Sequence, residues 1–268
     1  MDLLKRELAP VTSEAWGQID DEARRVLKLH LAGRKLVDFS GPHGITLGAV
    51  NTGRLKPESS SAVPEVAHRI RDVKALVELR TPILLPIAEL DTAARGAGDL
   101  DLDAVIGAAE RVAKAEDSAI FYGYEPAGIQ GIIPSSPHTP LEVKASVDWP
   151  RAVTAAKEVL RLAGVNGPYA LALSAGAYDE ITSGSDDGYP LRKRIYEAVA
   201  EGTLIWAPAL TNGAVLLSAR GGDYELTVGQ DLAIGYAAHD RSNVELYLTE
   251  SFTFRVLEDK AAILLKRL

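Results

Sequence analysis

Near the start of the chain, apolar residues recur at the spacing of one helix face. The stripe runs between Ser13 and Gly33 and consists of Trp16, Ile19, Ala23, Val26 and His30. Thr12 or Ser13 can cap the start of this helix, because a hydroxyl accepts a hydrogen bond from a free amide of the first turn. Gly33 is expected to end the helix. The pattern therefore predicts an amphipathic helix that opens the fold.

Toward the end of this helix, Leu27 and Leu31 widen the apolar stripe. A helix that packs on a small core needs only one stripe, so the additional leucines have two interpretations. They are either further core residues or a surface that contacts a second partner.

The same periodicity predicts further helices. Residues 99–119 carry a stripe of Val105, Ile106, Ala109, Val112, Ala113 and Glu116. A second helix starts at Trp149-Pro150 and runs to about residue 163, and a shorter helix is expected over 191–200.

Short alternating or apolar runs predict the strands. They lie at residues 36–39, 169–173, 203–206, 214–218, 224–228 and 244–256. Residues 75–90 are also rich in strand formers, but Pro82 and Pro86 confine that segment to a sheet edge or a bulge. In the longest strand Glu250 is the one polar residue on an apolar face, and the apolar tail 261–265 is expected to form a last strand or a docked segment.

One segment has no apolar face of its own. From residue 44 to about residue 73 the sequence has scattered small residues, weak alternation and the run Pro57-Glu58-Ser59-Ser60-Ser61. We expect a long two-stranded projection there. Such a projection is costly unless a neighbouring molecule covers it.

The order of elements indicates two domains in an α+β fold. Residues 149–220 form an α/β unit of their own, and the strands that follow carry as much apolar surface as the first helices. We therefore expect the first domain to be discontinuous, with the α/β unit inserted into it.

Composition restricts the class of protein. The 268 residues are 47% hydrophobic and 25% charged, with a net charge of −8 and no cysteine. Arg192-Lys193-Arg194 is the longest basic run, which is too little for a general nucleic-acid binder. No apolar run approaches the length of a membrane span. We expect a soluble cytoplasmic protein whose partners include neither nucleic acid nor a membrane.

The sequence contains no convincing catalytic constellation. Ser174 resembles a nucleophile elbow, but Ala172 stands where that motif needs glycine. The acids at positions 99, 101 and 103 lack the turn glycine of a calcium loop and are better explained as residues at a helix N-terminus. The five histidines have no metal-ligand spacing. We therefore expect no enzyme, no metal site and no resident cofactor.

Several separated motifs together resemble one family. They are LKRELAPVTSEAW, LAGRKLVDFSGP, GVNGPYALALS, GYPLRKRI, RGGDYELTVGQDLAIGY and YLTESFTFRV, and they run in order from end to end. The chain is similar to encapsulins, also called linocin-like bacteriocin proteins, which form bacterial nanocompartment shells.

The resemblance implies the fold of tailed-bacteriophage major capsid proteins. Its parts are an N-terminal arm and helix (1–43), an extended loop (44–73), a peripheral domain (74–148 and 221–268) and an inserted axial domain (149–220). It also gives the unsupported projection a purpose, because neighbouring subunits would cover it in a closed shell.

The function that the resemblance implies is a self-assembling icosahedral shell around a cargo enzyme. The cargo would be a ferritin-like iron-storage protein or a dye-decolorising peroxidase active against oxidative stress, recognised by its C-terminal targeting peptide. The matching docking residues are Leu27, Leu31, Arg34, Val37, Asp38, Asp231, Leu232 and Ile234. Val37 and Leu232 have the alternative of being core residues only.

The resemblance also places a fivefold pore at the tip of the axial domain. The matching loop, within the polar and flexible segment 181–190, is Ser183, Gly184, Ser185, Asp186, Asp187 and Gly188. A ring of Asp186 and Asp187 would favour cations such as iron; alternatively the loop is simply solvated. Some relatives bind flavin through a tryptophan where this chain has Ala88, so no flavin is expected.

Two other functions stay open at this point. A prophage major capsid protein that packages DNA would have the same fold, although the negative net charge disfavours it. A secreted bacteriocin or hydrolase would fit the family's older name, but it needs a signal peptide and a catalytic set.

Overall fold

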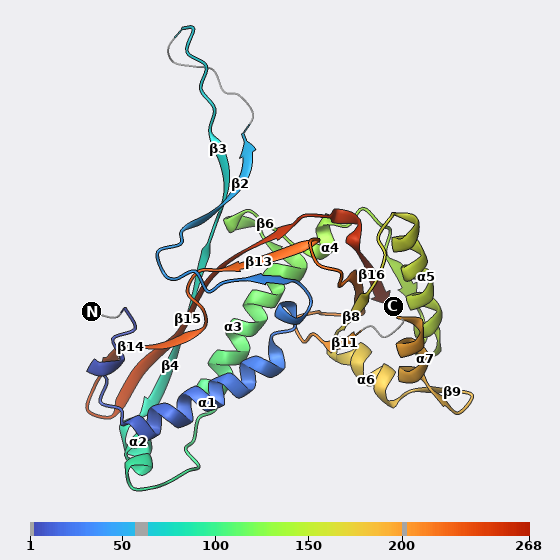
Figure 1. Ribbon diagram of the computed structural model, residues 1–268. Helices are drawn as coiled ribbons and strands as arrows, with labels where there is room; N and C mark the ends of the chain where they lie inside the picture. Colours follow the sequence, from blue (N-terminus) through green and yellow to red (C-terminus); the bar gives the residue numbers. More distant parts are fainter. Residues whose placement is uncertain (1–2, 57–63, 200–202) are drawn as a thin grey trace.

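The computed structural model describes residues 3–56, 64–199 and 203–268 (Figure 1). Two sheets with their helices lie side by side, and a long hairpin projects away from both (Figure 1). The described N-terminal residues lie beside the first sheet, and the C-terminus lies among the helices of the second part.

The first sheet is built around one long strand, β15 (Asn243–Val256). It pairs on one side with β13 (Tyr224–Val228) and β14 (Ala233–His239), and on the other with β4 (Val77–Pro86). A short parallel strand, β1 (Asp38–Ser40), extends the sheet beyond β13. Because β4 pairs with β15 alone among the described strands, the predicted edge position of its prolines is confirmed.

Three helices pack with this sheet. They are α1 (Ser13–His30), α2 (Ile87–Ala94) and α3 (Asp103–Tyr122). Alanines at 108, 109 and 113 of α3 are fully buried, which lets α1 approach α3 closely. The long α3 runs from the first sheet to the second, so it connects the two halves of the molecule.

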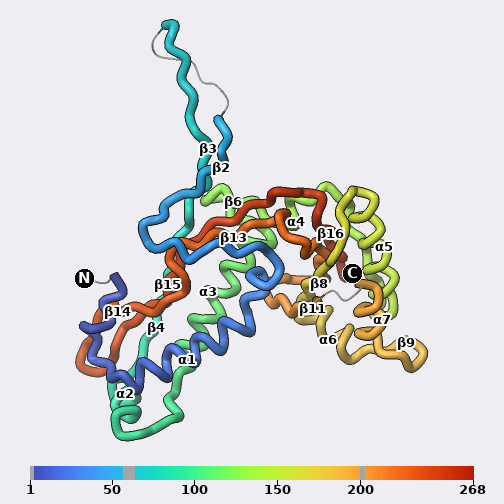
Figure 2. Tube along the Cα trace, viewed as in Figure 1, coloured from blue at the N-terminus to red at the C-terminus, as the bar shows by residue number. Residues whose placement is uncertain are grey.

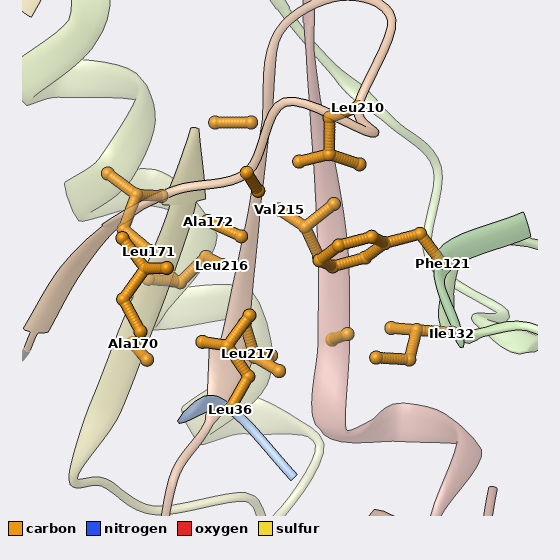
Figure 3. Close-up of a cluster of buried hydrophobic side chains, with 14 of the residues drawn as sticks. Leu36, Phe121, Ile132, Ala170, Leu171, Ala172, Leu210, Val215, Leu216 and Leu217 are labelled. Carbon is orange, nitrogen blue, oxygen red and sulfur yellow. The ribbon is translucent and has the colours of Figure 1, made fainter. Parts of the chain in front are cut away.

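The second sheet has the order β11-β8-β12-β16-β7. Its strands are β7 (Leu141–Val143), β8 (Tyr169–Leu173), β11 (Thr203–Trp206), β12 (Ala214–Ser218) and β16 (Ala262–Arg267). Helix α5 (Trp149–Leu162) packs against this sheet, with α6 (Ala175–Ser183) and α7 (Leu191–Ala198) beside it. Side chains from α3 and α4 (Ile132–Ser135) complete the core, which contains Phe121 of α3, Ile132 of α4 and Val215 of β12 (Figure 3).

The strand pairing differs from the predicted division of the chain. Strands β7 and β16 belong to the segments 74–148 and 221–268, which were predicted to be peripheral, yet both pair within the sheet of the inserted segment. The physical reason is that β12 has a free edge on the side away from β8, and the apolar tail Ala262–Leu265 fills it. As domain limits, the boundaries at 149 and 220 stay a prediction.

The projection consists of β2 (Ala49–Leu55) and β3 (Arg71–Ala75), paired antiparallel (Figures 1 and 2). Its side chains alternate between exposed and half-buried, as expected for a hairpin without a core. The run Pro57-Glu58-Ser59-Ser60-Ser61 and the two residues after it lie outside the described residues.

Short elements connect these parts. The 3-10 turns are η1 (Arg6–Leu8), η2 (Gly33–Lys35), η3 (Glu125–Ala127), η4 (Ser146–Asp148) and η5 (Asp259–Ala261). The short strands are β5 (Gly123–Tyr124), β6 (Ile129–Gln130), β9 (Ser185–Asp186) and β10 (Tyr189–Pro190).

Several local predictions need correction. Residues 87–90 are helical rather than extended, because Leu90 and Ala93 of α2 are buried on one face of a helix that follows Pro86. The helix expected from residue 99 begins at Asp103, and β14 and α6 were not predicted at all. No helix within the described residues has the length and apolar character needed to cross a membrane.

Candidate functional site

A groove of about 500 Å³ separates helix α1 from strand β14. Its floor is apolar and its rim is charged. Six of the eight predicted docking residues line it: Leu27, Leu31, Arg34, Asp231, Leu232 and Ile234. The lining residues that the sequence did not suggest are Arg6, Asp20, Ala23, Arg24, Lys28, Lys35, Ala233 and Leu248.

The helical wall of the groove is fixed at both ends. At the start of α1, Thr12 Oγ1 accepts a hydrogen bond from the amide of Ala15 at 3.3 Å. After its last residue, the carboxylate of Asp117 on α3 accepts the amide hydrogens of Ala32 at 2.9 Å and Gly33 at 2.8 Å. The chain therefore turns at one defined place and delivers Arg34 to the end of the groove.

Gly33 is required by this close approach of the turn to α3. A Cβ atom at this position would lie 2.5 Å from Cδ1 of Ile120 and 2.9 Å from Oδ1 of Asp117. The glycine thus acts by allowing contact with α3, and it lies after the end of the helix, which is already complete at His30.

The two helix leucines are more buried than the sequence suggested. Leu27 is 9% exposed and Leu31 is 7% exposed, and both belong to the apolar core of the first sheet. Both also line the groove, so their contact with a cargo peptide stays a prediction; the exposed leucine on α1 is Leu29, at 52%. Leu27 and Leu31 are core residues whose outer edges form the groove floor.

Arg34 is held by three carboxylates. Its Nε donates to both oxygens of Glu116 at 3.0 and 2.9 Å, and Nη2 donates to Glu116 at 2.7 Å and also to Glu250. Nη1 donates to Asp231 at 2.8 Å. Four of the five N–H bonds of a guanidinium are therefore used inside the protein. Arg34 thus links the walls of the groove and has little donor capacity left for a ligand.

Burial controls the electrostatics under this end of the groove. Glu116 and Glu250 are fully buried. Burial and the nearby charge of Glu116 raise the pKa of Glu250 well above its usual value, against the opposing effect of Arg34. Burial lowers the pKa of Arg34, but the hydrogen bonds and charges of its carboxylate partners outweigh this and raise it overall. Arg34 is therefore always charged here.

Val37 and Asp38 lie outside the groove. They line a separate cavity of about 150 Å³, whose other lining residues include Lys35, Ser218 and Tyr224. Lys35 lines both, so the two cavities lie near each other at this residue. Asp38 is exposed, and its Oδ2 accepts the amide hydrogen of Gly222 at 2.5 Å.

The predicted pore loop is a folded hairpin. Ser183 ends α6, and Ser185–Asp186 pairs with Tyr189–Pro190 as strands β9 and β10. Nη1 of Arg194 on α7 donates to the Asp186 carboxylate at 2.6 Å, whereas exposed Asp187 has no ion-pair partner among the described residues. In this hairpin Asp186 is paired and Asp187 has no such partner among the described residues, and a pore at this place stays a prediction.

The other chemical candidates have structural roles. Ser174 is buried and its Oγ accepts the amide hydrogen of Ala177 at 3.3 Å, so it caps α6. Asp101 accepts the amide hydrogen of Asp103 just before α3 starts. The described residues contain no cluster of three or more side chains suited to a metal ion.

Comparison with known proteins places this arrangement in a family. A model of the family described as encapsulating protein for peroxidase matches residues 1–253. A type 1 encapsulin shell protein of Brevibacterium linens is 45% identical over 265 residues, which cover 98% of each chain. The chain belongs to the encapsulin shell-protein family.

Solved structures agree on the fold. The virus-like particle of Pyrococcus furiosus has a TM-score of 0.66 at 16% identity, covering 94% of this chain and all of the other. The capsid of Myoviridae phage XM1 has a TM-score of 0.57 at 12% identity, covering 89% and 92%. The predicted capsid fold with both helix and sheet is thereby confirmed, and the role of this encapsulin-family chain is structural rather than enzymatic.

Proposed function

We propose that the chain assembles into a closed icosahedral shell in the cytoplasm and encloses a cargo protein. Family membership supports the shell, and the hairpin of β2 and β3 supports assembly, since it projects away from both sheets and its described side chains are exposed or only half-buried. Shells of this kind are closed by rotations between identical copies, which limit the product to a finite particle.

We further propose that the groove between α1 and β14 binds a C-terminal targeting peptide of the cargo. The observation that carries this proposal is the convergence of six residues, chosen from sequence resemblance and distant in the chain, on one groove with an apolar floor and a charged rim. A short peptide gains affinity when a few apolar anchors fill such a floor and polar contacts at the rim set its register.

A peroxidase is the first cargo to test, because the family is described as encapsulating protein for peroxidase. A ferritin-like protein is the second. In that case, we propose that the β9–β10 hairpin surrounds the fivefold opening and that one Asp187 per subunit attracts iron or another cation. The Ala88 position lies exposed on α2, and we propose that no flavin binds there.

The assembly proposal is tested with the purified chain alone. Size-exclusion chromatography and negative-stain imaging are expected to show uniform closed particles. Small species without closed particles would overturn the shell.

The cargo proposal needs co-expression with a fluorescent protein that ends in the C-terminal peptide of the peroxidase. Fluorescence is expected to elute with the particles. A fluorescent protein without the peptide is the control, and equal loading of both would contradict peptide docking.

The rival function of packaging DNA has a separate outcome. Particles that enclose nucleic acid would show a high ratio of absorbance at 260 nm to that at 280 nm and would protect the nucleic acid from nuclease. We expect neither, since the chain carries a net charge of −8.

A further inference from the structure

The first described residues of the chain run from β14 to α1, and one of them, Arg6, lines the groove. The amide of Tyr236 on β14 donates to the carbonyl of Leu4 at 2.8 Å, and the hydroxyl of Tyr247 donates to the carbonyl of Leu3 at 3.3 Å. The segment then turns at η1 and places Arg6 against α1. It therefore spans from the strand side of the groove to the helix side.

Arg6 is fixed in that position by two residues of α1. Its Nη1 and Nη2 donate to the two carboxylate oxygens of Asp20 at 3.1 and 2.7 Å, and its guanidinium carbon lies 3.9 Å from the centre of the Trp16 ring. A bidentate pair stacked on an aromatic ring holds the guanidinium plane in one orientation. Arg6 and Asp20 both line the groove.

The two ends of the groove consequently differ. At the Arg34 end, Lys35 also lines the separate cavity beside Val37 and Asp38. At the other end, the N-terminal segment lies across from β14 to α1. Three of the five N–H bonds of Arg6 have no acceptor among the described residues, so they can bind a group that arrives there.

We infer that Arg6 is the end stop of the groove, that is, the residue that closes one end of it and binds the free C-terminal carboxylate of the cargo peptide. The inference rests on the proposed docking function. The upstream end of the peptide continues into the cargo protein and cannot lie at a closed end, whereas the downstream end carries only a carboxylate. A terminal carboxylate is the group that the unused donors of a fixed guanidinium bind best.

The test compares two fluorescent proteins in co-expression with the wild-type chain at sub-saturating cargo. One ends in the native C-terminal peptide of the peroxidase, and the other carries a short Gly-Ser tail after it. The tail is expected to lower apparent affinity about tenfold, the effect of losing one charge-assisted hydrogen bond. Gly-Ser residues inserted before the peptide are expected to have no effect.

The variant Arg6→Ala is expected to load the native and tailed peptides equally, both at the lower level. Arg25→Ala is the matched control, because Arg25 also pairs with a carboxylate on α1, Glu22, but lies outside the groove. It is expected to keep the full discrimination. If Arg6→Ala fails to assemble, two other comparisons provide the same readout. One is the wild-type chain with the two peptides. The other is the variant Asp20→Asn, which removes the carboxylate that holds Arg6 in place.

The outcomes separate the two proposals. If the wild-type chain loads tailed and native peptides equally, or if Arg6→Ala retains the discrimination, the end stop is wrong and docking in the groove stands. If the wild-type chain loads neither peptide, the docking function and the end stop both fail.

Discussion

The guanidinium of Arg34 and the carboxylate of Glu116, which are 82 positions apart in the chain, form a buried pair with three hydrogen bonds of 2.7 to 3.0 Å. Glu250 completes the pair from β15. Both glutamates are fully buried, and the raised pKa of Glu250 favours its protonated form, so the cation of Arg34 mainly compensates the charge of Glu116.

The variant Arg34→Ala is expected to lower the free energy of unfolding by about 3–5 kcal/mol, because it leaves buried Glu116 without its cation and buried Glu250 without its hydrogen-bond donor. Thermal or denaturant unfolding measures the effect. Arg25→Ala removes an exposed pair on α1 and is expected to change stability little, because solvent screens exposed charges. Equal effects of the two variants would show that Arg34 has no structural role.

Gly33→Ala is expected to destabilise the chain by about 1–3 kcal/mol, since the added methyl group would press on Ile120 and on the Asp117 carboxylate. Gly17→Ala is the control, because no atom lies within 4 Å of a Cβ atom there and the position is inside α1. That substitution is expected to stabilise the helix by about 0.5–1 kcal/mol. A neutral Gly33→Ala would contradict the close approach of the turn to α3.

The buried carboxyl group of Asp117 makes the stability of the chain depend on pH, and the sign of this effect follows from its pKa. Burial raises the pKa of Asp117 to about 7, while the amides of Gly33 and Ala32 lower it only in part. The unfolded chain releases this proton near pH 4 and the folded chain near pH 7, so the stability from this group is full at pH 4 and is lost as the pH rises to 7. Asp117→Asn is therefore expected to be more destabilising, relative to wild type, at pH 5 than at pH 8. Melting temperatures at the two pH values measure this, and a difference of the opposite sign would contradict it.

Leu232 is the best position at which to test docking. It is half-buried at the groove rim, whereas Leu31 is a core residue whose replacement by a charge would disrupt folding. Leu232→Glu is expected to preserve particles but to abolish loading of a cargo that carries the peptide. Leu29→Glu introduces the same charge on the exposed part of α1, outside the groove, and is expected to load normally. Normal loading of Leu232→Glu would exclude this groove as the docking site.

The hairpin of β9 and β10 allows a test of the pore. Arg194→Gln releases the Asp186 carboxylate, and we expect faster entry of Cu²⁺, measured by quenching of an enclosed fluorescent protein at low salt. Asp187→Asn is expected to slow that entry. Both effects should vanish at high ionic strength, because salt screens exposed charges. Rates that do not change in either variant would place the pore elsewhere.

The sequence predicted the elements whose side chains follow one strong period. Helices α1, α3 and α5 and strands β8, β12 and β15 lie close to the expected ranges. Helix α2 was missed because the apolar run before it has no period and two prolines. The place of β16 depends on pairing with β12 and β7, which local patterns do not specify.

For the site, resemblance to a family identified six lining residues but not the network beneath them. Two signals pointed to that network: Glu116 lies on the buried stripe of its helix, and Glu250 is the polar residue on an apolar strand face. Two buried carboxylates require a cation, and Arg34 is the cation that the turn at Gly33 delivers. Arg6 could not be predicted, since its position depends on a turn outside any periodic segment.

Strand β16 also protects two strand edges of the second sheet. Residues 262–267 lie between β12 and β7 and contribute Ile263 and Leu265 to the second core. Among the described strands β7 pairs with β16 alone, so without β16 both β7 and the outer edge of β12 would expose unpaired backbone groups. Exposed edges of this kind pair with other chains, so β16 guards the fold against aggregation as well as completing its core.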